Sequence, residues 1–275
     1  MFERGLVKSI SLVLASVLLA GGAHAAGKCE RLIATGNPEY PPYLWRDPQN
    51  PGKLIGATVD LLERVSEELG VAIDVIYTGP WSRAQEEVRT GRVDMVAGAF
   101  LTLERLDSMD FVHPAFISTP NVVWVRKGKE FPYTGWADLQ GRTGDTLVNN
   151  SFGQDFDAYA RNNLTLEGVS SLTQAFQKLL LGRTDYVLYE RYPGLALAET
   201  LGLEEDLAVL DPPFSSEGLH LALSHNSACN DAWLRGQLAR KMTEFTAAGL
   251  PQSLLQRNLQ RWKDQPAQAA STPNQ

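Results

Sequence analysis

The segment from Thr90 to Phe116 constrains this chain more than any other. Its residues predict a helix that ends at Gly91, followed by a buried strand from Val93 to Ala97. Gly98 and Ala99 then allow a tight turn at the carboxyl end of that strand. Ligands of an open α/β sheet bind at this end of the strands. The segment therefore predicts an α/β fold with a ligand site beside this turn.

Two polar side chains follow the predicted turn, the hydroxyl of Thr102 and the guanidinium of Arg105. Arginine suits such a place because its rigid, permanently charged fork binds a carboxylate through two hydrogen bonds. The alternative is a solvated residue at a helix start, paired with Glu104 or Asp107. The residues alone leave both interpretations open.

The same segment and three others resemble the periplasmic solute-binding proteins of the polar amino acid type. Their order and spacing follow that family from about Arg31 to Trp262. The matching segments are DMVAGAFLTLER at 94–105, MDF at 109–111, PAF at 114–116, NPEYPPY at 37–43, GATVDL at 56–61 and GRTD at 182–185.

The resemblance implies a type II periplasmic binding protein fold, in which two α/β lobes are joined by two crossings and hold the ligand in the cleft between them. It assigns residues 26–117 and 217–262 to the first lobe and residues 118–216 to the second. We expect the crossings near Ile117–Thr119 and within 211–217. Such a molecule works as a hinge that closes on its ligand.

The two ends of the chain are expected to lie outside this fold. Residues 1–25 combine the cations Arg4 and Lys8 with an apolar run and a small-x-small cleavage site, the pattern of a secretory signal peptide. Residues 263–275 are polar and predict a disordered tail. The net charge of −7 argues against nucleic acid or an anionic membrane as partner.

The chain has two cysteines, Cys29 and Cys229. In an oxidising compartment outside the cytoplasm, the default expectation is an intramolecular disulfide. A metal pair or two free thiols are the alternatives, and only His225 near Cys229 hints at a metal. We expect no metal site and no cofactor.

The resemblance also implies a ligand site. Arg105, Thr102 and the backbone turn at Ser151, Phe152 and Gly153 would hold a carboxylate, and Glu190 would hold an ammonium group. Tyr40, Trp81 and Phe100 would enclose the ligand's side chain.

Each of these roles has a structural alternative. Tyr40 could pack on its own proline-rich loop, and Trp81 could cap the sheet. Ser151 is suited to cap a helix running to Arg161, where free amide groups would also face an anion. Glu190 could pair with Arg191 or Arg183, because a carboxylate ending an apolar strand needs a cation.

Two departures from the family pattern bear on the ligand. Phe100 stands where the family has a serine or threonine, and Asn37 stands where it has an aspartate. The loss of that carboxylate disfavours a lysine or arginine ligand. A modified amino acid, a dipeptide-like compound or another carboxylate remains open.

The sequence is therefore interpreted as a monomeric periplasmic protein that delivers an amino acid or similar carboxylate to an ABC permease. One alternative is an orphan or sensory binding protein that serves a receptor. Another is an enzyme on the same fold, such as a dehydratase with Glu190 as general acid. No spacing of nucleophile, base or metal ligands supports an enzyme.

Overall fold

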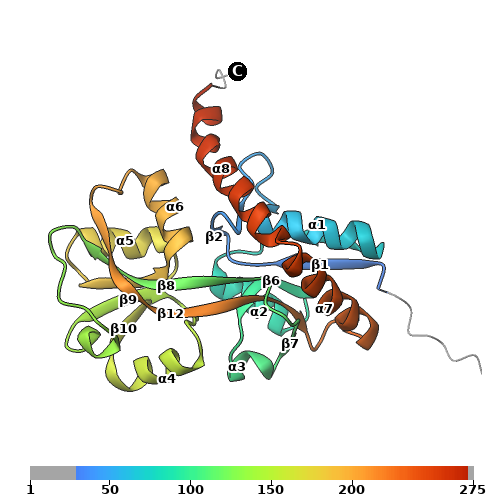
Figure 1. Cartoon of the computed structure of the whole chain (residues 1–275), viewed down its shortest axis with the longest axis horizontal. Helices are drawn as coiled ribbons and strands as arrows, with labels where there is room; N and C mark the ends of the chain where they lie inside the picture. Colours follow the sequence, from blue (N-terminus) through green and yellow to red (C-terminus); the bar gives the residue numbers. More distant parts are fainter. Residues whose placement is uncertain (1–28, 272–275) are drawn as a thin grey trace, which may run out of the picture.

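The computed structural model describes residues 29–271, so the expected signal peptide lies outside the described residues. The protein has two lobes built on one mixed sheet of nine strands, with the strand order β10-β9-β11-β8-β12-β6-β1-β5 and β7 paired to β12 (Figure 1). The strands are β1 (Arg31–Thr35), β5 (Ala72–Val75), β6 (Met95–Phe100), β7 (Met109–Phe111), β8 (Ile117–Arg126), β9 (Thr143–Leu147), β10 (Thr165–Val169), β11 (Tyr186–Glu190) and β12 (Leu207–Ser224).

Helices cover the sheet in both lobes (Figure 1). The helices of the first lobe are α1 (Ala57–Leu69), α2 (Trp81–Arg89), α3 (Leu103–Leu106), α7 (Ala232–Ala247) and α8 (Leu250–Ser271). Those of the second lobe are the 3-10 helix η1 (Trp136–Leu139), α4 (Gln154–Asn163), α5 (Leu172–Leu180) and α6 (Arg191–Leu201). A small sheet of β2 (Glu39–Tyr40), β3 (Leu44–Arg46) and β4 (Leu54–Ile55) completes the first lobe.

The long strands β8 and β12 connect the lobes. They run antiparallel, with Ile117 opposite Leu219 and Asn121 opposite Ser215, and their register shifts between Leu210 and Ser215. Figure 1 shows both strands passing side by side from one lobe to the other. The fold thus has the two crossings of a hinged binding protein, while the exact lobe boundaries stay a prediction.

β8 shows why the sheet is buried on both faces. Val122 and Trp124 belong to the larger core cluster, whereas Val123 and Val125 belong to a second cluster in the second lobe. Successive side chains of a strand point to opposite faces, so an unbroken apolar run serves two layers at once. This pattern is typical of a strand covered by helices on both sides.

The strand in the central segment is longer than expected. We predicted a tight turn at Gly98 and Ala99, but β6 continues to Phe100, which pairs with Leu219 of β12. Gly98 has a φ of 117°, and the register of β12 shifts between His220 and Leu221. Because β6 pairs with β12, the strand continues past Gly98. The backbone freedom of this glycine allows an irregularity in the pairing at a point where we had expected a turn. Phe100 is therefore held within the sheet.

Helix α8 extends further than expected. It continues to Ser271, so the prediction of a disordered tail from residue 263 is wrong for the described part. Trp262 Nε1 donates to the Ala196 carbonyl at 2.9 Å, and Trp45 Nε1 donates to Gln265 Oε1 at 3.1 Å. These contacts dock the last part of the helix on both lobes. Residues 272–275 lie outside the described residues.

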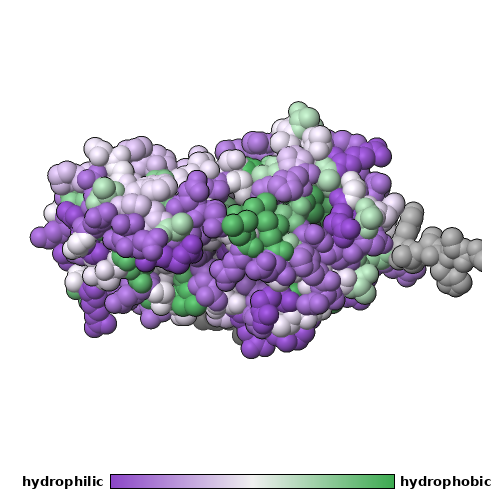
Figure 2. Space-filling view, turned by 90° about the horizontal axis from the view of Figure 1, so that it is seen from below, coloured by the Kyte–Doolittle hydropathy of each residue, from purple (hydrophilic) through white to green (hydrophobic). Residues whose placement is uncertain are grey.

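The surface shown in Figure 2 is largely hydrophilic around a hydrophobic patch near its middle. Helix α3 lies at the lower side of the view in Figure 1, and its Leu103 and Leu106 are 66% and 38% exposed. In residues 29–271 no helix combines the length and apolarity that crossing a membrane requires.

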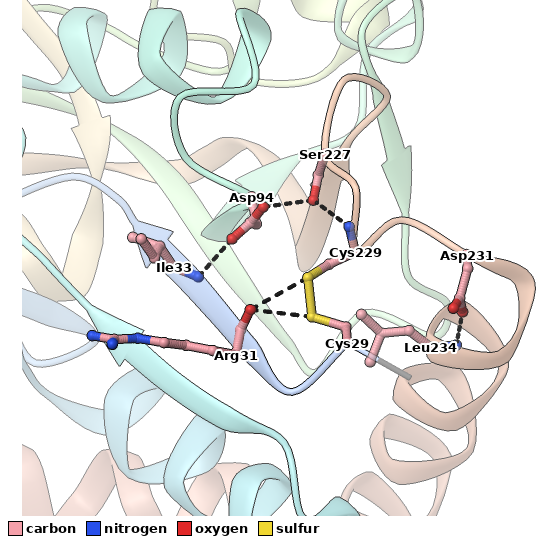
Figure 3. The surroundings of a disulfide bond; sticks show 8 residues. All are labelled: Cys29, Arg31, Ile33, Asp94, Ser227, Cys229, Asp231 and Leu234. Atoms are coloured by element: carbon pink, nitrogen blue, oxygen red, sulfur yellow. Dashed lines mark hydrogen bonds between the residues drawn. A yellow bond between two sulfur atoms is a disulfide. The ribbon is translucent and has the colours of Figure 1, made fainter. Parts of the chain in front are cut away.

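Cys29 and Cys229 form a disulfide, as predicted (Figure 3). The loop that carries Cys229 is also fastened to β1 by hydrogen bonds. Cys229 N donates to Ser227 Oγ at 3.0 Å, Ser227 Oγ donates to Asp94 at 2.6 Å, and Asp94 accepts the Ile33 amide at 2.8 Å. The crosslink therefore joins the opening strand of the first lobe to the segment that leads into α7.

Replacing both cysteines by serine is expected to lower the free energy of unfolding by about 2–4 kcal/mol, because the crosslink spans 200 residues and restricts the unfolded chain. Urea denaturation of the unreduced proteins measures the difference. Reductant should destabilise the wild type by a similar amount and leave the double variant unchanged. Equal stability of the two proteins would contradict the prediction.

Candidate functional site

A small cavity lies between the lobes, at the carboxyl end of β6 and β11. Its volume is about 20 Å³, which is room for a water molecule and not for an amino acid. Five residues predicted for the ligand site line it, namely Tyr40, Trp81, Phe100, Arg105 and Glu190. The remaining lining residues are Asn37, Gly98, Ala99, Asn150 and Leu219.

The lobes are closed on each other around this cavity. Gln85 Nε2 of α2 donates to the Asn149 carbonyl of the second lobe at 3.1 Å. On the other side, the Leu172 amide at the start of α5 donates to Glu39 Oε2 of the first lobe at 3.0 Å. A ligand larger than water therefore requires the lobes to move apart or the lining side chains to rearrange.

Arg105 is buried, with 8% exposed, and its guanidinium contacts only uncharged acceptors. It donates to the Phe100 carbonyl at 2.8 Å and to Gln85 Oε1 at 3.0 Å. In the described part of the chain it forms no ion pair within 4.0 Å. Burial lowers the pKa of Arg105 to about 10, although Asp157, Glu104 and Glu190 oppose the shift. The alternative of a solvated arginine paired with Glu104 or Asp107 is wrong.

Glu190 ends β11 and is 4% exposed. Burial raises the pKa of its carboxyl group to about 7, against the opposing effects of its own amide, Tyr40 and Arg105. Its Oε2 atom has no hydrogen-bond partner within the described residues. Arg191, its predicted alternative partner, contacts Asp211 instead. The cavity thus holds one buried cation and one buried anion, each without an ion-pair partner.

Aromatic rings enclose the cavity on the side of the first lobe. Tyr40 stacks on Tyr43 with ring centroids 5.0 Å apart, so it packs on its loop and lines the cavity at the same time. Trp81 is the first residue of α2, and its ring lies 5.5 Å from the Arg105 guanidinium carbon. The Trp81 indole N–H is buried without a hydrogen-bond partner within the described residues, and the Tyr40 hydroxyl lies close enough to Glu190 to oppose the rise of that residue's pKa.

The predicted carboxylate turn of the second lobe is placed differently. Ser151 is not the helix cap, because α4 begins at Gln154 and Gly153 occupies the cap position. The Asp157 carboxylate accepts the Ser151 hydroxyl and the Phe152 amide, and the Gly153 amide donates to Ser151 Oγ at 3.3 Å. The carboxylate of the first helical turn competes for these donors, so the backbone amides do not face the small cavity.

Ser151 and Phe152 instead line a wider groove between the lobes, about 980 Å³ in volume. Thr102 lines this groove too, and its hydroxyl caps α3 by accepting the Arg105 amide at 3.2 Å. Gly153 lines neither space, and an added Cβ there would lie 2.1 Å from Glu217 Oε1. By accepting the Arg105 amide, the Thr102 hydroxyl fixes the backbone that carries Arg105.

Sequence reasoning gave no role to Asn150, Gln85 and Tyr189, and it treated Asn37 only as a departure from the family pattern. Asn37 Nδ2 donates to the Tyr189 hydroxyl at 2.9 Å, a bond between the lobes. Asn150 lines the cavity with an amide nitrogen that has no hydrogen-bond partner in the part of the chain that the structure describes, and Gln85 orients Arg105. Asn150 precedes a turn that was already singled out, but the roles of Gln85 and Tyr189 depend on contacts between distant segments.

The chain matches the family model of the bacterial extracellular solute-binding proteins, family 3, over residues 32–261. A probable amino-acid ABC transporter-binding protein of Haemophilus influenzae is 25% identical over 165 residues, which cover 60% of this chain. The match spans 61% of that relative's length.

The fold is shared with solved structures of binding proteins and of a sensor domain. The amino acid ABC transporter substrate-binding protein AbpA of Streptococcus pneumoniae, bound to L-arginine, superposes with a TM-score of 0.70 at 18% identity, covering 85% of this chain and 96% of AbpA. A histidine kinase sensor domain with similarity to periplasmic binding proteins superposes with a TM-score of 0.70 at 21% identity, covering 84% of this chain and 96% of the domain. In residues 29–271 no group of three His, Cys, Asp or Glu side chains could hold a metal ion.

Proposed function

Since the chain belongs to the bacterial extracellular solute-binding proteins of family 3, we propose that it captures an amino acid or a similar small carboxylate and delivers it to an ABC importer. One observation supports this class of ligand. A buried guanidinium and a buried carboxylate line the same cavity, and neither has an ion-pair partner in the described part of the chain. A zwitterion would compensate both charges at once.

Each charge comes from a different lobe. Arg105 lies in α3, just after β6, and would bind the ligand's carboxylate, while Glu190 ends β11 and would bind its ammonium group. Tyr40, Trp81 and Phe100 would enclose the side chain, and the free donors on Trp81 and Asn150 suit an acceptor on it. Asn37 offers a ligand cation no counter-charge, because it is a neutral amide, and it already donates to Tyr189 and accepts the Glu39 amide.

The proposed cellular location and the proposed partner follow from the family. Residues 1–25 would direct export to the periplasm, and the partner would be a permease in the inner membrane that receives the ligand from a monomer. The relatives are binding proteins, which favours capture over catalysis at Glu190. The sensor domain with the same fold supports a second candidate, in which the protein presents its ligand to a receptor.

A thermal-shift screen with amino acids and small carboxylates tests the ligand class. A ligand at a hundred times its Kd is expected to stabilise the native state by about 2.7 kcal/mol, which raises the melting temperature. No shift with any zwitterion or carboxylate would overturn the proposal.

A further inference from the structure

A short segment of the first lobe, residues 37–39, is hydrogen-bonded directly to the second lobe. Asn37 Nδ2 donates to the Tyr189 hydroxyl at 2.9 Å, and this hydroxyl donates to the Glu39 carbonyl at 3.2 Å. The Glu39 carboxylate in turn accepts the Leu172 amide at 3.0 Å. We call these four residues, Asn37, Glu39, Leu172 and Tyr189, the interlobe latch. It joins the segment that leads into β2 to strand β11 and to the start of α5.

Tyr189 is the centre of the interlobe latch. Its side chain is 1% exposed, and its hydroxyl both accepts and donates a hydrogen bond. Asn37 is held in the orientation that this bond needs, because its Oδ1 atom accepts the Glu39 amide at 3.0 Å and leaves Nδ2 for Tyr189. With the lobes closed, loss of the hydroxyl would leave the buried Asn37 amide group without its acceptor, whereas water could replace that acceptor if the lobes opened. The latch bonds therefore favour closed lobes.

The interlobe latch lies beside the ligand cavity. Tyr189 directly precedes Glu190 on β11, and its ring packs edge-on against the ring of Tyr40 with centroids 6.3 Å apart. Asn37 lines the cavity, whereas Tyr189 and Glu39 are not among the lining residues. A change of Tyr189 or Glu39 therefore acts on the site through the relative position of the lobes.

We propose that Tyr189 and Glu39 are positioning residues of the binding site. Together with Asn37 they hold the lobes in the arrangement that brings Glu190 of the second lobe and Arg105 of the first lobe to one cavity, without touching the ligand themselves. The role of these two charges rests on the function proposed above. The latch itself is tested on the protein alone, so its failure and the failure of the proposed ligand class are distinguishable.

Two backbone amides report directly on contact between the lobes. The Leu172 amide of α5 donates to Glu39, and the Leu103 amide of α3 donates to Gln154 Oε1 of the second lobe at 3.1 Å. Both residues begin their helices, where amides have no acceptor within the helix. Their hydrogen exchange, measured by NMR on the full mature chain, therefore depends on how often the lobes separate.

Tyr189→Phe keeps the ring and removes only the hydroxyl. It is expected to speed exchange of the Leu172 and Leu103 amides about tenfold, because one buried polar group loses its partner when the lobes are closed. The amides of Gln174 and Arg105 lie in the same two helices but donate to hydroxyls of their own lobes, so their exchange should not change. These two amides also verify that the variant is folded.

Matched variants isolate the latch. Tyr186→Phe makes the same substitution on the same strand, where the hydroxyl is buried without a hydrogen-bond partner in the described residues, and should leave exchange at Leu103 unchanged. Glu39→Ala should speed exchange at Leu103, and Glu39→Gln, which keeps an acceptor oxygen for Leu172, should do so less.

The exchange pattern decides the proposal. Faster exchange at both Leu172 and Leu103 in Tyr189→Phe, with Gln174 and Arg105 unchanged, would support it. An effect confined to Leu172 would make the latch a local contact, and equal acceleration of all four amides would make it a general contribution to stability. Either of these results, or no change in Tyr189→Phe, would overturn the proposal.

Discussion

Arg105→Ala is expected to weaken binding of the cleft ligand by at least tenfold, an effect on the order of 2–5 kcal/mol. The guanidinium is already buried and bonded to the Phe100 carbonyl and Gln85, so it is oriented before the ligand arrives. Its removal leaves the ligand's carboxylate desolvated without a counter-charge. Isothermal titration with the compound found by thermal shift measures the change.

Two further variants make this test specific. Arg105→Lys should also lose most of the affinity, because an ammonium group cannot donate to Phe100, Gln85 and a carboxylate in the same geometry. Arg64→Ala is the control, since Arg64 is exposed on α1 and pairs with Glu67. Retained affinity in Arg105→Ala, with an unchanged melting temperature without ligand, would exclude Arg105 as the carboxylate site.

Glu190→Gln is expected to weaken binding of an amino acid by a similar factor, because an ammonium group would then be buried against a neutral amide. Burial raises the pKa of Glu190 to about 7, and the ligand's ammonium favours the ionised carboxylate. The free protein must therefore release a proton as it binds. Affinity of the wild type should rise between about pH 5 and pH 7 and level off above, while Glu190→Gln should show no such rise.

The same group makes the stability of the ligand-free protein depend on pH. The pKa of Glu190 is raised in the folded state, from 4.5 to about 7, so its contribution to stability is full below pH 4.5 and is lost as the pH rises through 7. A shift of this size corresponds to at most about 3 kcal/mol. Denaturation at pH 5 and pH 8 should show a larger loss of stability for the wild type than for Glu190→Gln.

The two variants together identify the ligand class. If Arg105→Ala abolishes binding and Glu190→Gln has no effect at any pH, the ligand is a plain carboxylate without an ammonium group. If neither change matters, the small cavity is not the binding site. A pH dependence that persists in Glu190→Gln would assign the titration to another group.

The sequence by itself determined the features that depend on local pattern. The order of the matching segments indicated the two-lobed fold, and it singled out Arg105, which lies just after β6, and Glu190, which ends β11, as candidate site residues. The pairing of Cys29 with Cys229 followed from their number and compartment. These inferences needed no knowledge of which distant segments touch.

Only the tertiary structure decided which of several available partners a segment or side chain contacts. β6 runs past Gly98 because β12 pairs with it, and the turn at Ser151 faces away from the cavity because Asp157 takes its donors. Helix α8 continues past Lys263, and Trp262 within it docks on α6. In each case a contact between separated residues outweighs the local preference of the chain, because hydrogen bonds and burial become available only when the segments meet.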